Sequence, residues 1–378
     1  MLPQQKGLLK RTKIPWIILF LAQITFLFGP GRAREIQEAS KSAEKSSFVV
    51  LPIVFYTPET KFAGGIGGLF TFRPPSAKAS DRPSSISFYA IGTQLQQFRT
   101  KWEPSLYLSH EKYLISGKFI LERFPDKYWG IGNRTSDNAE EDITPRMISL
   151  EAAFQTKLFP KQPLYAGLTF VFESFKVMKI APDKDLASGK IPGSSGGTIL
   201  GAGFILNWDS RDNVFFPRRG DYWQLTTYFN GKTLGGDFSY TSAKLNIRHY
   251  IPIFRSHVLA FQGVLQIAHG NPPFNRYAAL GGDMMMRGYY TGRFRDKTLV
   301  AAQTEYRLPV WRRFGLVCFA GVGDVAPNLG AFGFGHLKSS MGFGIRFKIV
   351  PREGANLRID FAWGKNTSGV YFTAGEAF

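Results

Sequence analysis

Beyond residue 33, the sequence alternates large apolar side chains with polar or charged ones over many short segments. In the segment 357–364, LRIDFAWG, the four large apolar residues fall on one face of an extended chain, and the arginine and aspartate fall on the other. The segments 148–158, 222–230 and 341–348 follow the same pattern. A repeat of two residues is that of a β-strand whose two faces meet different surroundings. The chain is therefore expected to be all-β.

The composition leaves two all-β architectures open. Hydrophobic residues make up 44% of the chain, and beyond residue 33 no apolar run approaches the ~20 residues that a membrane helix needs. In a soluble sandwich the polar face of each strand would meet bulk water. In a transmembrane barrel the apolar face would meet lipid, and alternation would dilute the apolar residues twofold.

The lengths of the connections favour the barrel. We expect sixteen strands, at residues 49–56, 62–73, 85–95, 97–109, 111–123, 147–158, 164–177, 197–208, 221–230, 236–250, 256–267, 298–308, 314–324, 338–349, 355–364 and 368–378. The long connections all follow odd-numbered strands, namely 124–146, 178–196, 268–297 and 325–337. Connections after even-numbered strands are mostly short, and 74–84 and 209–220 are of middling length.

Long loops outside and short turns in the periplasm are typical of transmembrane barrels. Closing the sheet also pairs every backbone N–H and C=O, which lipid requires. We therefore predict a transmembrane antiparallel β-barrel of about sixteen strands.

The first residues resemble an export signal. Four basic side chains precede an apolar run at 14–28, and the small residues Gly31 and Ala33 follow it. This order is typical of a cleavable signal peptide. We expect a signal peptide at 1–33, a short periplasmic segment at 34–48, and the barrel at 49–378, in the outer membrane of a bacterium.

The charge and the reactive residues exclude several functions. The formal net charge is +19, but Lys and Arg are scattered and no nucleic-acid motif accompanies them, so a wet lumen and anionic lipid explain the excess better. The single Cys318 excludes a disulfide framework, and the five dispersed histidines make zinc improbable. No nucleophile motif is present. We expect neither an enzyme nor a bound metal or cofactor, and outer-membrane lipid as a partner.

The most specific stretch is LGGDMMMRGYYTGRFRD, residues 280–296, in the longest connection. Gly281, Gly282 and Gly288 permit backbone conformations that other residues resist, so the loop is expected to fold back on itself. Arg287 lies between them and could enter a polar lumen to pair with a carboxylate. The inward faces of later strands offer two, Glu305 and Asp360.

This stretch resembles the Arg-Gly-aromatic motif, here Arg287-Gly288-Tyr289, in the sixth extracellular loop of the BamA/TamA-type superfamily, also called the bacterial surface antigen family. Glu305 stands where that family has an inward partner for the loop arginine. GFGIRF, with Arg346, and LRIDFAWG resemble the penultimate strands. The resemblance covers roughly residues 49–378.

Two further segments carry the resemblance. DSRDNVFFPRRG is similar to the family's periplasmic turn, through Asp209, Arg211, Asp212, Pro217 and Gly220. YFTAGEAF is similar to the closing strand, and its Phe372, Gly375 and Phe378 resemble the C-terminal signal of outer-membrane barrels. A terminal aromatic there suits the interfacial girdle of a barrel.

Two departures from the family are visible. Gly321 stands where the family usually has an aspartate, and Asp324 has the opposite parity, which would place it outward at the rim. The latch is therefore expected to rest on Arg287 and Glu305. Between Ala33 and the first strand there is no room for a periplasmic POTRA domain, so the chain resembles the barrel-only subset.

The resemblance implies a barrel that assists insertion or translocation of proteins, or of lipid, with nascent outer-membrane or secreted proteins as partners. Pro52 in the first strand cannot donate a ladder hydrogen bond, which would loosen the seam with the last strand and leave an edge for an incoming strand. Pro52 as a tolerated residue, and a purely structural latch, stay open. The alternative function is a passive pore or surface-binding barrel, which would favour anions through Lys157, Arg307, Arg346, Lys348 and Arg358.

Overall fold

The computed structural model describes residues 46–57, 60–78, 80–254, 256–351 and 353–378. The expected signal peptide at 1–33 lies outside the described residues, as does most of the segment 34–48. The first strand begins at Ser46, three residues earlier than expected.

Sixteen strands form one antiparallel sheet in the order of the sequence, which confirms the predicted number and arrangement. They are β1 (Ser46–Thr57), β2 (Lys61–Phe72), β3 (Ser84–Thr93), β4 (Phe98–Leu108), β5 (Tyr113–Arg123), β8 (Pro145–Lys157), β9 (Leu164–Val177), β10 (Gly196–Asp209), β11 (Gly220–Asn230), β12 (Tyr240–Ile253), β13 (His257–Gly270), β16 (Thr298–Trp311), β17 (Phe314–Ala326), β18 (Lys338–Val350), β19 (Ala355–Gly364) and β20 (Thr367–Ala374).

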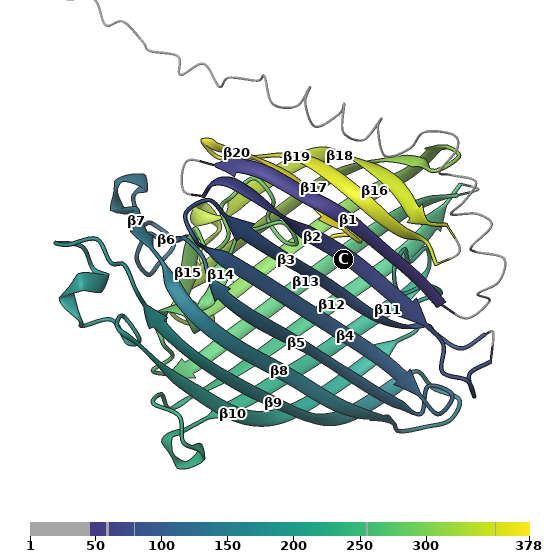
Figure 1. Cartoon of the computed structure of the whole chain (residues 1–378), viewed down its shortest axis with the longest axis horizontal. Helices are drawn as coiled ribbons and strands as arrows, with labels where there is room; N and C mark the ends of the chain where they lie inside the picture. Colours follow the sequence, from purple (N-terminus) through teal and green to yellow (C-terminus); the bar gives the residue numbers. More distant parts are fainter. Residues whose placement is uncertain (1–45, 58–59, 79, 255, 352) are drawn as a thin grey trace, which may run out of the picture. The chain divides into compact units, whose positions relative to one another are not determined.

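The sheet rolls up so that its beginning meets its end (Figure 1). Arg73, just after β2, forms an ion pair of 3.1 Å with Glu353, in the turn between β18 and β19. Val49 of β1 packs against a buried cluster that contains Val350 and Ala355. β1 and β20 are the two edges of the sheet, and no ladder pairing joins them among the described residues.

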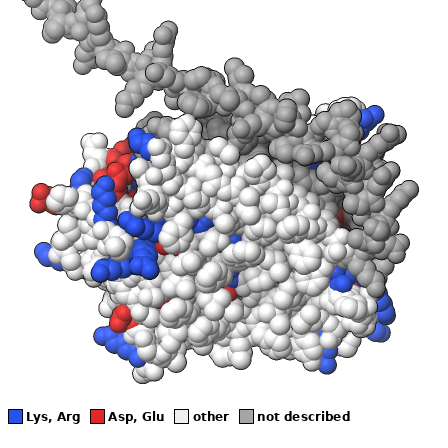
Figure 2. Space-filling model, viewed as in Figure 1, with Lys and Arg blue, Asp and Glu red and all other residues white. Residues whose placement is uncertain are grey.

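The two faces of the strands carry different side chains, as the alternation predicts. Outward apolar side chains are largely exposed, including Leu168, Phe204 and Val370 at 61–63%. Inward polar side chains such as Gln155 and Asp360 are fully buried. Charged residues gather toward the two ends of the strands and leave a mostly uncharged band between them (Figure 2). This surface is that of a transmembrane barrel, with lipid outside and a polar interior.

Two of the long connections contain short hairpins of their own. One contains the hairpin β6 (Asp126–Tyr128) and β7 (Glu141–Ile143), and another contains β14 (Ala278–Leu280) and β15 (Phe294–Asp296). Gly132 donates its N–H to the carbonyl of Arg295 at 2.8 Å, which joins the two connections. We call this end of the barrel the long-loop end, and the opposite end the short-turn end.

The helical segments of the described ranges are short 3-10 turns, namely η1 (Asp137–Ala139), η2 (Leu186–Ser188), η3 (Lys232–Leu234), η4 (Phe274–Arg276), η5 (Leu329–Ala331) and η6 (Phe334–His336). None of them could span a bilayer.

The end of the last strand differs from the prediction. β20 stops at Ala374, and Gly375, at φ +85°, turns the chain inward. Phe378 is 3% exposed and packs with Tyr250, Val258 and Ala260, which are inward residues of β12 and β13. The expectation of Phe378 in the outward aromatic girdle is therefore wrong. The physical reason is that polar partners inside the barrel hold residues 375–378.

The lipid-facing assignment can be tested on Phe204, in the middle of β10. Phe204→Arg should lower the free energy of unfolding in vesicles by about 2–4 kcal/mol, because an arginine near the middle of the bilayer must be desolvated. The control is Gln224→Arg on β11, whose side chain lines a lumenal cavity and should tolerate the charge. Equal losses in both variants would contradict the assignment.

Candidate functional site

The connection 271–297, which we call loop 6, folds into the barrel. Gly281, Gly282 and Gly288 all have positive φ, of +108°, +122° and +104°. At Gly288 a Cβ atom would lie 2.7 Å from the backbone of Trp363, so only glycine allows this close approach to β19. The predicted role of these glycines in folding the loop back is consistent with this geometry.

Tyr289 fixes the loop beside the last strands. Its hydroxyl donates to the carbonyl of Ser339 at 3.0 Å and accepts from the N–H of Lys365 at 2.9 Å. Tyr371 of β20 accepts from the N–H of Gly288 at 2.8 Å. The loop motif is thus hydrogen-bonded to the edge strand of the sheet.

Arg287 reaches two carboxylates in the lumen. Its Nη2 lies 2.6 Å from Glu305 Oε1 on β16, and its Nη1 lies 2.7 Å from Asp360 Oδ2 on β19. The three side chains are 0% exposed, and the guanidinium stacks on the ring of Phe319 at 3.5 Å. Asp360 thus supplies a second carboxylate, and both inward acids that the sequence offered as partners of Arg287 contact it.

Three more arginines extend this pair into a network. Arg307 contacts Glu305 at 2.9 Å, and Arg358 contacts Asp360 at 2.8 Å. Arg346 contacts Asp360 at 2.6 Å and Glu376 at 2.8 Å. We call this set the lumenal network; with Asp283, which contacts Arg358 at 3.3 Å, it holds four cations and four carboxylates.

The balance of charge explains how so many ions can be buried. An unpaired buried charge costs several kcal/mol, whereas a paired and hydrogen-bonded one recovers much of that cost. Gly344 leaves the space that the network needs, because a Cβ atom there would lie 2.0 Å from Asp360 Oδ1.

The inward residues 375–378 belong to the same network. Glu376 accepts a hydrogen bond from Asn356 at 2.6 Å in addition to its ion pair with Arg346. The carbonyl oxygen of Phe378 accepts from Arg307 at 2.7 Å. Loop 6 and the segment after β20 are therefore held by neighbouring arginines of one buried cluster.

Gly321 lies in close contact with loop 6. A Cβ atom at Gly321 would lie 3.3 Å from Met286 Sδ and 3.2 Å from Gln303 Cβ. Met286 is fully buried, so an aspartate at 321 would have to displace its side chain. Asp324 is also fully buried, beneath Asn133, which donates to it at 2.8 Å, and the exposed rim position expected for it is wrong.

The turn at 210–219 lies across the short-turn end. Asp209 binds Arg211 through two contacts of 2.8 Å and also pairs with Arg82 at 3.0 Å. Burial acts to lower the pKa of Arg211, but the attraction of Asp209 outweighs it and raises that pKa above its ordinary value. Asp212 accepts from the N–H of Arg218 at 2.9 Å.

The other two residues expected at this turn also pack closely within it. Pro217 is buried, and Gly220 has φ +99° with no room for a Cβ atom beside Ser210. The turn residues predicted from the sequence therefore lie together, and Arg82 joins them from the turn before β3.

A second anchor of loop 6 was missed by sequence reasoning. Arg276 contacts Glu151 of β8 at 2.9 Å and Glu173 of β9 at 2.6 Å, on the wall opposite the lumenal network. Lys118 completes this group with a contact of 3.2 Å to Glu151. No local pattern could have signalled these pairs, because more than 100 residues separate the partners in sequence.

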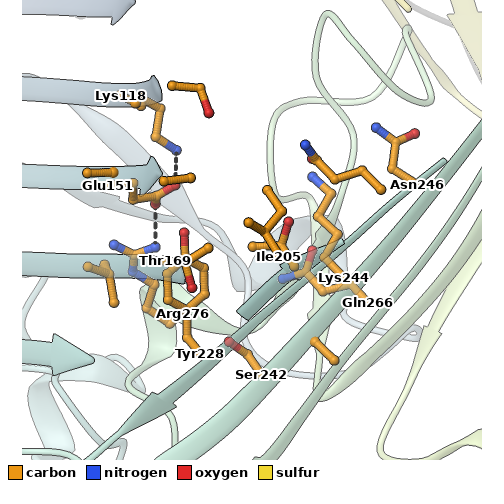
Figure 3. A pocket seen from close by; sticks show the side chains of 18 of the residues that line it. Lys118, Glu151, Thr169, Ile205, Tyr228, Ser242, Lys244, Asn246, Gln266 and Arg276 are labelled. Atoms are coloured by element: carbon orange, nitrogen blue, oxygen red, sulfur yellow. Dashed lines mark hydrogen bonds and ion pairs between the residues drawn. The ribbon is translucent and has the colours of Figure 1, made fainter. Parts of the chain in front are cut away.

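Beside Arg276 lies a polar lumenal chamber of about 450 Å³. Figure 3 shows Lys118, Glu151 and Arg276 linked on one side of it, with Lys244, Gln266 and Asn246 on the other. The described residues contain no group of three or more His, Cys, Asp or Glu side chains placed to bind a metal ion.

The fold and the lumenal network define a transmembrane β-barrel whose sixth loop is fixed inside the lumen by a buried arginine. The Omp85 superfamily domain matches residues 85–378, and the chain belongs to that superfamily.

Two solved structures share this fold. BamA from Haemophilus ducreyi lacking POTRA domains 1–3 is 14% identical, with a TM-score of 0.54, over 87% of this chain and 69% of that one. CdiB from Acinetobacter baumannii is 10% identical, with a TM-score of 0.53, over 87% of this chain and 59% of that one. No curated protein matches the sequence.

The contribution of Arg287 to the free energy of unfolding can be measured directly. Arg287→Gln should lower the free energy of unfolding by about 3–5 kcal/mol, because the lumenal network would then hold four carboxylates against three arginines, with one buried negative charge left unbalanced. The stability of Arg287→Lys should lie between those of the wild type and Arg287→Gln, since one ammonium keeps the charge but cannot contact both carboxylates as the guanidinium does. The control is Arg123→Gln, an exposed arginine outside the lumenal network. Urea unfolding that gives wild-type stability for Arg287→Gln would refute the latch.

The exchange of aspartate for glycine at 321 also makes a prediction. Gly321→Asp should destabilise the barrel by about 1–3 kcal/mol through overpacking against Met286. In a Met286→Ala background the same substitution should cost less, which a double-mutant cycle would measure. An equal cost in both backgrounds would show that Met286 is not the obstacle.

Proposed function

We propose that this chain assists insertion or translocation of other proteins at the bacterial outer membrane, and that the seam between β1 and β20 receives the client. Membership of the Omp85 superfamily supports a protein substrate. The short-turn end would then face the periplasm, and the long-loop end would face the exterior.

The observation that carries the proposal is the inward turn of residues 375–378. The hydrogen-bonded part of β20 spans 8 residues, while β1 spans 12, so the last strand is too short to pair with all of the first. Pro52, in the middle of β1, lacks an N–H as well. A strand edge with unpaired backbone groups can template an added strand.

The lumenal network would couple this edge to loop 6. Arg346 binds both Glu376, beyond β20, and Asp360, which binds Arg287 of the loop. If Glu376 moved away, Arg346 would lose one of its two carboxylates. If loop 6 moved away, Asp360 would lose Arg287. A client strand that pairs with β1 would displace residues 375–378 from inside the barrel and leave Glu376 to be satisfied elsewhere.

The alternative of an anion-favouring pore has less support. Arg307, Arg346 and Arg358, three of the inward cations that suggested it, are neutralised by carboxylates. Loop 6 also occupies part of the lumen through Arg276 and Arg287.

The seam proposal is tested by locking it. In a Cys318→Ser background, which removes the exposed native thiol, cysteine pairs would join positions 48–54 of β1 to positions 368–374 of β20. The protein is expressed in cells depleted of the wild-type copy, and the outer-membrane proteins and lipids are counted. Locked seam pairs should reproduce the depleted profile, and reduction should restore the normal one.

The matched control is a cysteine pair at Leu206 and Leu225, which face each other across β10 and β11 far from the seam in the sheet order. That crosslink should leave the profile unchanged. A normal set of outer-membrane proteins with the seam fully locked would exclude the gate. No change in proteins on depletion itself would exclude the assembly role.

A further inference from the structure

A second cavity lies at the short-turn end, against β16, β17 and β18. Its volume is about 170 Å³. Six cationic side chains line it, and no acidic one does among the described residues; the six are Arg218, Arg307, Arg312, Arg313, Arg346 and Lys348. We call this cavity the basic pocket. It goes beyond the proposed function, because neither the seam nor the loop motif requires it.

Two of these arginines are buried and only partly satisfied. Arg307 and Arg346 are 1% and 3% exposed. Their contacts to Glu305, Asp360 and Glu376 leave Nη1 of Arg307 and Nη2 of Arg346 buried without a hydrogen-bond acceptor in the described chain, although Nη2 of Arg346 lies 3.9 Å from Glu305 Oε1. A buried donor without a partner is costly, especially on a charged group.

Three other cations have no carboxylate to neutralise them. Arg312, Arg313 and Lys348 form no ion pair with an acidic side chain in the described part of the chain. Arg312 instead lies over the ring of Trp311 at 5.0 Å. The lumenal network balances cations with carboxylates, whereas the basic pocket keeps an excess of positive charge within a small volume.

The walls and the mouth of the pocket indicate which anion fits. Apolar side chains such as Leu308 and Val317 line it and strengthen electrostatic attraction inside it. Phe314, which lines the pocket, is exposed and stacks with the exposed Trp311 at 6.2 Å. Aromatic side chains of this kind sit at the headgroup level of a bilayer. The pocket therefore opens near the depth of lipid phosphates.

We propose that the basic pocket binds a phosphate group, presented by a phospholipid headgroup or as a free phosphate. Guanidinium groups match the oxygen atoms of phosphate with paired hydrogen bonds, and the lysine adds a point charge. The position of the aromatic pair favours the headgroup. An anion in the pocket would place negative charge beside Arg307 and Arg346, and so stabilise the network from the short-turn end.

The test uses the full chain, refolded in an uncharged detergent, and isothermal titration calorimetry. The probes are inorganic phosphate, short-chain phosphatidylglycerol, and the matching diacylglycerol, which lacks phosphate. The variant Arg313→Gln/Lys348→Gln removes two cations that lie outside the lumenal network. It should weaken phosphatidylglycerol binding by about tenfold or more, because it loses charge-assisted contacts.

The control variant Lys161→Gln/Lys190→Gln removes the same charge from two exposed sites outside the pocket and should bind like the wild type. Heat-dependent gel mobility checks that each barrel is folded, and Lys348→Gln alone serves if the double variant is not. Binding of the phospholipid but not of phosphate or diacylglycerol supports a headgroup site. Binding of both phosphate and phospholipid, in competition, supports a site for phosphate from either source.

Three results would overturn the proposal. The first is that neither phosphate nor phosphatidylglycerol binds. The second is that diacylglycerol binds as tightly as the phospholipid. The third is that the Arg313→Gln/Lys348→Gln variant binds as tightly as the Lys161→Gln/Lys190→Gln control. None of these results bears on the seam, so the outcome is separable from that of the crosslinking experiment.

Discussion

Lipid offers no hydrogen-bond partner to a backbone, and this constraint governs the whole molecule. Each strand from β2 to β19 satisfies its N–H and C=O groups on both sides through its two neighbours in the sheet. Only β1 and β20 have an edge for which no partner strand is described. Loop 6 and residues 375–378 both lie in the lumen behind that edge.

The lumenal network lies directly behind the edge. Arg287 enters it from loop 6, and Glu376 enters it from the segment after β20. Arg287 contacts Asp360, Asp360 contacts Arg346, and Arg346 contacts Glu376. Removal of loop 6 or of the segment after β20 would therefore leave a buried charge with fewer partners. This coupling is the one that the proposed opening of the seam would use.

The lumen is filled unevenly. The side formed by β16 to β20 holds the motif of loop 6 and the inward residues 375–378, whereas the side formed by β5 to β13 contains the polar chamber. Loop 6 reaches both sides, through Arg287 and through Arg276. Its position is therefore set by two ion-pair groups on opposite walls, each of which can be weakened separately.

Much of this could be predicted from the sequence because it depends on local pattern. The repeat of two set the number of strands and the face of each residue, since successive side chains of a strand point to opposite sides. Gly288 and Arg287 could be identified from the sequence because a left-handed backbone favours glycine, and because arginine is the residue suited to a buried pair with carboxylates. Glu305 and Asp360 were identifiable as inward acids on regular strands.

Only the tertiary structure decided which distant residues meet. Asp360 as the second partner of Arg287, Arg276 as a second anchor, and the burial of Phe378 all depend on how the sheet curls, which alternation does not specify. The same holds for Gly321, because its close contact with Met286 of loop 6 joins residues that are distant in sequence. Strand pattern is a property of neighbours in sequence, but charge pairing in a lumen depends on distances across the barrel.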